Sequence, residues 1–268
     1  MKKHYKRALT IAGSDPSGGA GIQADLKTFS ACGCYGMSAI VAVVDENTVG
    51  VTGVHPVPVD FVTGQIRSVL DDIGADAVKI GMLHSSELIR AVRQTLAAYD
   101  IRNVVLDPVM VATSGDRLLQ EEAIATLKEE LIPFVRVITP NIPEAEILLG
   151  RKIAGQEELP QVARELSLGR KVSVLLKAGH LHDAELIDVF YNAETDEATP
   201  LRSMRLDTPN THGTGCTLSS AVAAFLAQGL PLDEAVACAK EYAAIIAGAA
   251  YEIGHGHGPV HHFFNFWE

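Results

Sequence analysis

The sequence predicts an α/β protein, a three-layer α/β/α sandwich whose central sheet is mostly parallel. Short continuous apolar runs such as 39–44 and 104–106 alternate along the chain with longer segments of helical periodicity. Continuous hydrophobicity is typical of strands that are covered on both faces, as in parallel sheets. The alternation continues through all 268 residues without a low-complexity linker. We therefore expect a single domain, residues 1–268.

Each element of the first half follows from a local pattern. The apolar run 8–12 predicts a short buried strand, and the glycine-rich turn 13–19 after it opens a helix. That helix has a regular apolar face, and Gly33 stands just past its end. The remaining elements expected here are strands at 39–44, 77–80 and 104–106 and amphipathic helices at 59–73 and 87–98.

The second half continues the same alternation. Buried strands are expected at 136–139 and 172–176, and Pro143 opens the helix that follows the first of them. The runs 187–191 and 201–206 are less apolar and are compatible with an exposed β-hairpin. The last expected elements are two helices, around 214–228 and 232–251.

Residues with chemical potential stand at the carboxyl ends of the expected strands. In open parallel sheets, ligands bind outside those ends. The sequence contains neither a Walker A motif nor G-x-G-x-x-G, which argues against a P-loop enzyme and weakens a dinucleotide dehydrogenase interpretation. The residues at the strand ends are Asp15, Glu46, Met82, Asp107, Asn141, Glu144 and Lys177.

The stretch 208–229 carries the strongest single signal. A turn-prone run leads into Gly213, Thr214 and Gly215, and an apolar helical pattern begins at once. Glycines before a helix let a ligand approach the backbone, and the unpaired N–H groups of the first turn can seat an anion such as phosphate. The same position should lower the pKa of Cys216 and make a thiolate available. The alternative is a glycine-rich loop before a core helix, with Cys216 as a small buried residue.

Three further side chains supply what phosphoryl transfer needs, namely positioning and charge stabilisation. Asp107 and Glu144 carry hard oxygens that suit Mg²⁺ arriving with a nucleotide, and Lys177 can neutralise phosphate oxygens. Each also has a simpler explanation. Asp107 could form a turn before Pro108, Glu144 could be a first-turn helix carboxylate, and Lys177 could be solvated. Their common placement at one edge of the sheet favours function.

Composition excludes several other classes of protein. The formal net charge of −11 argues against nucleic acid or an anionic membrane as a partner. The opening MKKHYKR followed by ALTIAG imitates a signal peptide, but its apolar run is too short, and no run approaches membrane-spanning length. Four cysteines without paired C-x-x-C motifs indicate a reducing compartment, so we expect a cytoplasmic protein.

Seven segments are specific enough to indicate a family. They read IAGSDPSGGAGIQADLKTF, KIGMLHS, VVLDPVM, TPNIPEAEILLG, LLKAGH, NTHGTGCTLSSA and GHGHGPVHH. The chain, from about residue 8 to residue 262, resembles the hydroxymethylpyrimidine kinase / phosphomethylpyrimidine kinase family of thiamine biosynthesis, within the ribokinase-like superfamily. The resemblance implies that ATP phosphorylates 4-amino-5-hydroxymethyl-2-methylpyrimidine (HMP) to HMP phosphate and then to HMP pyrophosphate. It also implies Mg²⁺ and a homodimer.

The resemblance further assigns roles to positions of this sequence. Cys216 stands where sugar kinases of the superfamily have an aspartate base, and Gly213, Thr214 and Gly215 form an anion hole. The identity of any monovalent cation is left open. The substrate-binding residues it implies are Asp25, Glu46, Met82 and Val109. The ATP-binding residues are Lys177, Asn141 and Thr214, and the Mg²⁺ ligands, direct or through water, are Asp107 and Glu144.

One position departs from the family pattern. Relatives read A-Q-N-T where this chain has Asp45-Glu46-Asn47-Thr48. Glutamine both donates and accepts, whereas an ionised Glu46 only accepts, so a ring nitrogen loses its donor unless Glu46 is protonated. Pyridoxal kinase, which shares the scaffold, is therefore the alternative substrate assignment. A non-catalytic pyrimidine-binding protein is the alternative of another class, although ring binding alone would not need the phosphoryl-transfer residues.

The histidine-rich tail 254–262 invites a zinc interpretation, because clustered histidines can bind metal. The tail has no neighbouring cysteine or carboxylate cluster, and it matches the C-terminal signature of the family. We therefore assign no zinc site to it. Cys32 and Cys34, which flank Gly33, are expected to be structural.

Overall fold

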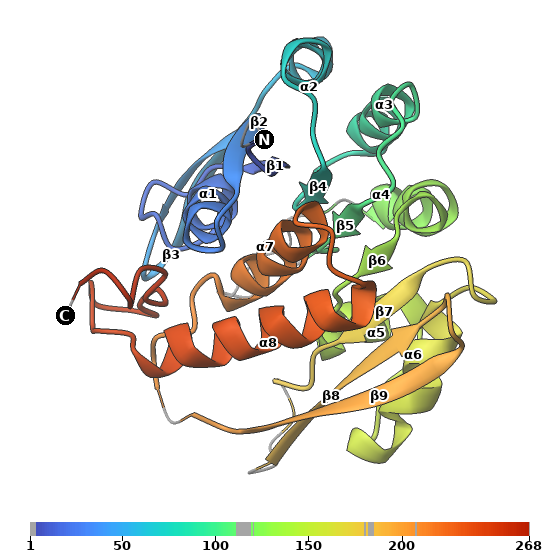
Figure 1. Cartoon of the computed structure of the whole chain (residues 1–268), viewed down its shortest axis with the longest axis vertical. Coiled ribbons are helices and arrows are strands. Elements are labelled where there is room, and N and C mark those ends of the chain that lie inside the picture. Colours follow the sequence, from blue (N-terminus) through green and yellow to red (C-terminus); the bar gives the residue numbers. More distant parts are fainter. Residues whose placement is uncertain are drawn as a thin grey trace.

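The structure is a computed structural model and describes residues 4–110, 119, 121–179, 181, 185–206 and 208–267. It confirms the predicted sandwich, since helices cover both faces of a central sheet (Figure 1). In the described residues this sheet has nine strands in the order β3-β2-β1-β4-β5-β6-β7-β8-β9. In this spatial order, the six neighbouring strands β2-β1-β4-β5-β6-β7 are parallel. Strand β3 at one edge and strands β8 and β9 at the other are antiparallel.

The parallel strands are short in the middle of the sheet and fully buried there. Every residue of β4 to β7 is buried, which explains their continuous apolar sequences. The parallel strands are β1 (Arg7–Gly13), β2 (Tyr35–Asn47), β4 (Ala77–Ile80), β5 (Val104–Leu106), β6 (Val137–Ile138) and β7 (Ser173–Leu176). The antiparallel strands are β3 (Gly50–Pro56), β8 (Glu185–Asn192) and β9 (Glu197–Met204).

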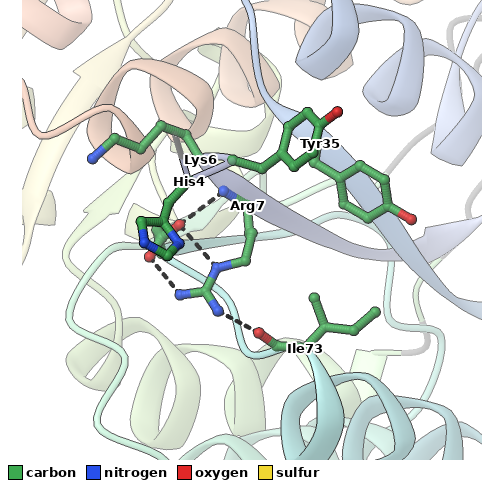
Figure 2. A pocket seen from close by; sticks show the side chains of 7 residues that line it. His4, Lys6, Arg7, Tyr35 and Ile73 are labelled. Atoms are coloured by element: carbon green, nitrogen blue, oxygen red, sulfur yellow. Dashed lines mark hydrogen bonds and ion pairs between the residues drawn. The ribbon is translucent and has the colours of Figure 1, made fainter. Parts of the chain in front are cut away.

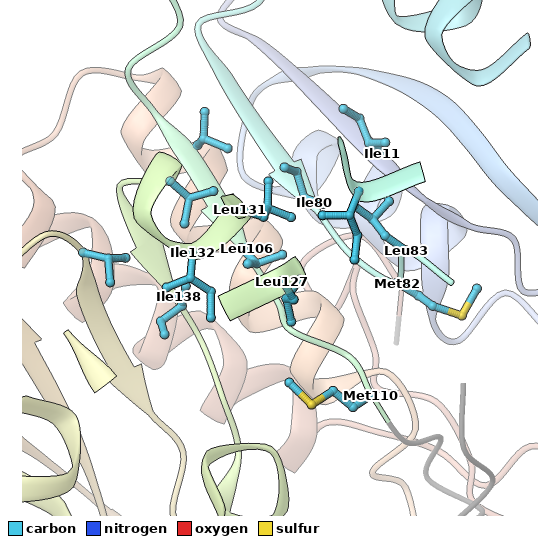
Figure 3. Close-up of a cluster of buried hydrophobic side chains, with 14 of the residues drawn as sticks. Ile11, Ile80, Met82, Leu83, Leu106, Met110, Leu127, Leu131, Ile132 and Ile138 are labelled. Atoms are coloured by element: carbon cyan, nitrogen blue, oxygen red, sulfur yellow. The ribbon is translucent and has the colours of Figure 1, made fainter. Parts of the chain in front are cut away.

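The two helical layers each bury one face of the sheet. In the core beneath one layer, Ile80 and Leu106 of the central strands meet Leu127, as Figure 3 shows. The neighbouring Val105 points the other way, as strand geometry requires, and belongs to the second core. The first layer contains α2 (Val59–Asp72), α3 (Ser86–Leu96), α4 (Glu121–Thr126), α5 (Ile142–Leu149) and α6 (Leu159–Leu166). The second contains α1 (Gly21–Ala31), α7 (Thr214–Ala227) and α8 (Leu232–Gly248).

Helix α7 is the central helix of its layer. Ten of its fourteen residues are buried, most of them alanine, serine or threonine. Small side chains let α7 approach the sheet, α1 and α8 closely, and its N-terminus is therefore held firmly against the strand ends. Among the residues that the structure describes, none of the helices combines the length and the apolar character that crossing a membrane requires.

The largest difference from the prediction lies at the edge next to β2. Strand β2 does not end before Asp45 but continues to Asn47, because it pairs with β3 in an antiparallel hairpin. The sequence of β3 contains two glycines and has little apolar alternation, so it is not predicted, and neither are α4 and α6. The hairpin expected at 187–206 is confirmed as β8 and β9. Pro143 is the second residue of α5 rather than the first.

Candidate active site

The carboxyl ends of β5, β6 and β7 bring a lysine and an aspartate together beneath the start of α7. Lys177 Nζ donates to Asp107 Oδ1 at 3.0 Å, and Thr139 Oγ1 donates to the same oxygen at 2.9 Å. Gly215 lies directly over this pair, since a Cβ added there would stand 3.2 Å from Lys177 Nζ and 3.7 Å from Asp107 Oδ2. Three residues predicted from strand-end position and from the glycine run are thus neighbours.

Asn141 and Glu144 form a capping box at the start of α5. Asn141 Oδ1 accepts from the N–H of Glu144 at 2.9 Å, and Glu144 Oε2 accepts from the N–H of Asn141 at 2.8 Å. Asn141 also bridges to Lys177 as in a parallel sheet, which ties α5 to the end of β7. Glu144 is thus a first-turn helix carboxylate, as the simpler explanation proposes, and it also lies within the electrostatic reach of Lys177 and Asp107.

The pKa of Glu144 is governed by its burial rather than by its charged neighbours. Its exposed fraction is 3% and that of Asp107 is 2%. Burial raises the pKa of Glu144 to about 7, and Asp107 adds to the rise, although Lys177 and two backbone N–H groups act against it. A cation bound beside Glu144 would stabilise its ionised form against this burial.

Cys216 is the third residue of α7, and its thiol lies near the N–H of Gly21 at the start of α1. The prediction of a lowered pKa is wrong. Burial raises the pKa of the thiol to about 11, and nearby carboxylates add to this, while Lys79 and the Gly21 N–H oppose it. Desolvation of the thiolate therefore outweighs the favourable place at a helix N-terminus.

Within the described residues, the start of α7 has no side-chain cap and is built from glycines. Gly213 has a φ of +76°, and a Cβ there would lie 1.8 Å from the carbonyl oxygen of Gly19, so only glycine fits. Thr214 turns its Oγ1 back to the carbonyl of Thr211 at 2.8 Å, and in the described part of the chain no side chain caps this helix. The predicted anion seat is thus a helix N-terminus that no described side chain caps, and its two glycines pack closely against Gly19 and Lys177. Together with Lys177 and the two carboxylates we call it the phosphoryl half of the site.

A fully buried polar cluster centred on Asp25 lies next to Cys216. Both Asp25 oxygens accept from Lys79 Nζ at 2.9 Å, and Thr10 and Ser220 each donate to one of them at 2.6 Å. The exposed fraction of Asp25 and of Lys79 is 0%. The family resemblance places Asp25 in the lining of the pocket, whereas in the structure its carboxylate is engaged in the interior. Lys79 is not predicted as functional, although a lysine inside the buried strand AVKI is a detectable signal.

Asp15, His212 and Glu46 form a second group, which we call the substrate half. His212 Nε2 lies 2.8 Å from Asp15 Oδ2 and 4.0 Å from Glu46 Oε1. Burial opposes ionisation of Asp15, yet the bond to His212 and further donors hold its pKa well below the usual range. Burial and the neighbouring Asp15 raise the pKa of Glu46. The other donors to Asp15 are Ser17, Gly19 and Ala20.

Met82 contacts the substrate side of the site and Val109 the phosphoryl side. A Cβ on Gly13 would stand 3.2 Å from the Met82 methyl and 3.6 Å from Val44 of β2, so Met82 lies near the strand that carries Glu46. The N–H of Val109 donates to the carbonyl of Asp107 at 2.8 Å. His212, unlike these two, is not predicted as functional, although it stands within the motif NTHGTGC.

A hollow at the other end of the strands, where their amino ends lie, is a poorer candidate. It lies at the amino ends of β1 and β2 and is lined by Tyr5, Lys6 and Tyr35, among others (Figure 2). Its arginine, Arg7, is already paired with Asp76 at 2.8 Å. Ligands of parallel sheets bind at the carboxyl ends of strands, so we assign no catalytic role to this hollow.

Solved structures first define the class of protein. The chain has the fold of the Bacillus subtilis pyridoxal kinase in its ADP complex, with a TM-score of 0.87 at 38% identity over 97% of this chain and 98% of that one. The phosphomethylpyrimidine kinase of Clostridium difficile 630 matches with a TM-score of 0.78 at 43% identity, over 89% of this chain and 98% of that one. The fold is that of a ribokinase-like small-molecule kinase.

The sequence then gives the family within that class. The family model described as phosphomethylpyrimidine kinase matches residues 15–261. The hydroxymethylpyrimidine/phosphomethylpyrimidine kinase of Rhizobium meliloti (strain 1021) is 51% identical over 264 residues, which cover 97% of this chain and 98% of that protein. This chain belongs to the phosphomethylpyrimidine kinase family.

Proposed function

We propose that this protein uses ATP to phosphorylate HMP, and then phosphorylates HMP phosphate to the pyrophosphate. The observation that carries the proposal is the meeting, at the strand ends, of Lys177, Asp107 and the start of α7, which no described side chain caps. Phosphoryl transfer depends mainly on positioning and charge stabilisation, which these groups supply. Membership of the family supports the pyrimidine substrate, and the ADP complex of the Bacillus pyridoxal kinase supports ATP as the donor.

The two phosphorylations make different demands on Cys216. In the first, the HMP hydroxyl oxygen attacks the γ-phosphorus, the bond to the ADP oxygen breaks, and the hydroxyl proton passes to the thiolate form of Cys216, which becomes the thiol. In the second, the attacking oxygen belongs to a phosphate monoester, which is mostly dianionic at pH 7 because its second pKa is about 6. No base is needed there. Gly213, Gly215 and Lys177 hold the transferring group in both steps, and Asn141 and Thr214 border the nucleotide.

Mg²⁺ fits the residues present. Asp107 and Glu144 offer hard oxygens, and burial raises the pKa of Glu144, so a cation bound there would stabilise its ionised form. The described residues contain no group of three or more histidine, cysteine, aspartate or glutamate side chains that could hold a metal ion. We therefore propose an ion shared between these two carboxylates, directly or through water, and the nucleotide phosphates. When bound, it would neutralise charge on the transferring phosphoryl group.

We further propose that the protein is a cytoplasmic homodimer whose ligands are small molecules rather than nucleic acid or membrane. The net charge of −11 supports the ligand class. Val43 and Tyr35 of β2, Val54 of β3 and Phe61 of α2 are exposed apolar side chains at one edge of the sheet, and they support a partner surface there. Sedimentation equilibrium at micromolar concentration tests the subunit number.

A coupled assay of ADP release tests the proposed activity. We expect turnover with HMP and with HMP phosphate, and a lower kcat/KM with pyridoxal. A preference for pyridoxal would overturn the substrate assignment while sparing the kinase. Binding of HMP without any ADP release would favour the non-catalytic pyrimidine-binding protein.

A further inference from the structure

The C-terminal segment 254–262, which we call the tail, lies against the turn between β2 and β3 (Figure 1). Three N–H groups of the tail bind one residue of that turn. Those of His255 and Gly256 donate to Thr48 Oγ1 at 3.2 and 3.3 Å, and that of His257 donates to the Thr48 carbonyl at 2.8 Å. Thr48 is two residues from Glu46, so the tail touches the substrate half of the site from outside.

The tail also holds the loop before α7 and the loop before α1. The N–H of His212 donates to the carbonyl of Gly258 at 3.1 Å, and His212 and Pro259 pair as a parallel bridge. A Cβ on Gly19 would stand 2.4 Å from His212 Cδ2 and 3.0 Å from Pro259 Cβ. The tail, the His212 loop and the loop that carries Asp15 therefore meet in direct contact.

The alternating glycines of the tail make this contact possible. An added Cβ would lie 2.3 Å from Thr48 Oγ1 at Gly254, 2.0 Å from the Thr48 carbonyl at Gly256 and 2.1 Å from Asn210 Oδ1 at Gly258. At each of these positions a side chain would fit only if Thr48 or Asn210 moved away. Glycine at every second position lets the backbone lie flat against two loops at once.

The far end of the tail is anchored to the helices behind the site. The N–H of His261 donates to the carbonyl of Ile246 at 3.1 Å, and the carbonyl of His262 accepts from Tyr242 Oη at 2.9 Å. Thr217 Oγ1 and His262 Nε2 are hydrogen bonded at 3.0 Å in a buried contact. The tail is thus fixed to α7 and α8 at one end while its glycines touch the substrate half at the other.

We propose that the tail is a positioning element for substrate discrimination, whose glycines hold the Glu46 turn and the His212 loop at their working separation. This rests on the proposed function, because the discrimination in question is between HMP and similar rings. The histidine-rich run thus acts through its backbone and its glycines rather than as a metal site. The tail touches the substrate half and not Lys177 or Asp107, so it acts on substrate binding more than on the transfer step.

The test compares Gly256→Ala with Gly248→Ala, where an added Cβ at the end of α8 meets nothing within 4 Å. We expect Gly256→Ala to raise KM for HMP about tenfold, within the range expected when a binding group is misplaced. The KM for ATP and kcat should stay within about twofold. Gly248→Ala should leave all three constants unchanged. A Gly256→Ala protein with wild-type kinetics, or one that loses kcat and thermal stability together, would overturn the proposal.

A second variant guards against misfolding of the first. Thr48→Val keeps the shape of the side chain and removes the oxygen that accepts from His255 and Gly256. We expect a rise in KM for HMP of about threefold and a lower preference for HMP over pyridoxal, since a lost hydrogen bond has an effect of this order. Unchanged KM and preference would count against the tail. The wild type in the same assay separates the proposed function from the positioning role. Absent turnover of HMP by the wild type would refute the proposed function, whereas normal turnover with unchanged KM in both variants would refute the positioning role.

Discussion

The two halves of the site are built in different ways. Asp107, Glu144 and Lys177 stand at the ends of central strands or at the start of the helix that follows. Lys177 and Asp107 are paired, and both carboxylates are largely withdrawn from water. Asp15, Glu46 and His212 come from two loops and from a hairpin at the edge of the sheet, and the Glu46 side chain keeps 18% of its surface exposed. Asp15 and His212 are bonded at 2.8 Å, but Glu46 Oε1 lies 4.0 Å from His212 Nε2.

This difference suggests a division of labour. Groups on rigid strand ends can hold a transferring phosphoryl group with little reorganisation, which suits chemistry common to a whole class of kinases. Groups on loops can change without disturbing the core, which suits recognition of one ring among several. The sequence resemblance places the departure from the family pattern at Glu46, in the half that is built from loops and the β2–β3 hairpin. Predictions that separate chemistry from recognition therefore test the comparison directly.

The largest effect is expected in the phosphoryl half, for Cys216→Ala. If the thiol is the base, kcat for HMP should fall about 10²–10⁴-fold, the usual range for loss of a general base. ATP binding should change little because Lys177 and the backbone remain. Turnover of HMP phosphate should fall much less, since its attacking oxygen needs no base. Steady-state kinetics with the two substrates measure both effects.

Two controls sharpen the result for Cys216. Cys238→Ala removes another partly exposed thiol, on α8, and should leave the rates unchanged. Cys216→Asp, which imitates the sugar kinases, should retain more activity than Cys216→Ala. Near-normal HMP turnover in Cys216→Ala would return Cys216 to the alternative of a small residue in a core helix.

A metal titration gives the next largest effect. Asp107→Asn and Glu144→Gln should each raise the Mg²⁺ concentration needed for half-maximal rate, by roughly 10–100-fold, because a neutral amide is a weaker ligand for a hard cation. Glu146→Gln, two residues along α5 and paired with Lys152, is the matched control. Unchanged titrations in both active-site variants would mean that the nucleotide and water hold the ion without these carboxylates.

The pH dependence of HMP turnover should reflect the raised pKa of Cys216. A thiol acts as a base only after losing its proton, and with a pKa of about 11 the thiolate fraction grows about tenfold per pH unit below that value. We expect kcat for HMP to rise from pH 8 to pH 10, above the range in which Glu144 titrates. Cys216→Asp should show a flat profile there. A flat wild-type profile would mean that the thiol only orients the hydroxyl.

The contrast between strand ends and loops also explains which features could be predicted from the sequence. Apolar runs and strand-end positions led to the sheet, to Asp107 and Lys177 and to the glycine start of α7, because central parallel strands leave a regular pattern. The pKa of Cys216 could not be predicted, since it depends on desolvation by segments far apart in the chain. The β2–β3 hairpin and the contact of Gly256 with Thr48 also escaped prediction, because loops meet through tertiary packing and leave no periodic signal.

The smallest effect expected at the site itself belongs to Glu46, and it tests the substrate half. Burial and Asp15 raise the pKa of Glu46, so its protonated form, which can donate like glutamine, is reached at higher pH than usual. Glu46→Gln should keep or improve kcat/KM for HMP, by up to about tenfold, because an unpaired acceptor on the ring costs about 1–3 kcal/mol. The gain should grow as pH rises and Glu46 loses its proton, while the glutamine variant stays constant.

Pyridoxal separates this account from its alternative. It has no amino group to donate to Glu46, so it should remain the poorer substrate in the wild type and in Glu46→Gln. Asp45→Asn, an exposed carboxylate one residue away, serves as the control for loss of charge alone. If Glu46 is occupied only with His212 and the backbone reads the ring, Glu46→Gln will leave both substrates within about twofold, as surface substitutions do. Values of kcat/KM for the two substrates on the three proteins, at pH 6 and pH 8, distinguish these outcomes. A wild-type preference for pyridoxal would mean that the substrate half recognises a different ring, and it would leave the account of the phosphoryl half unchanged.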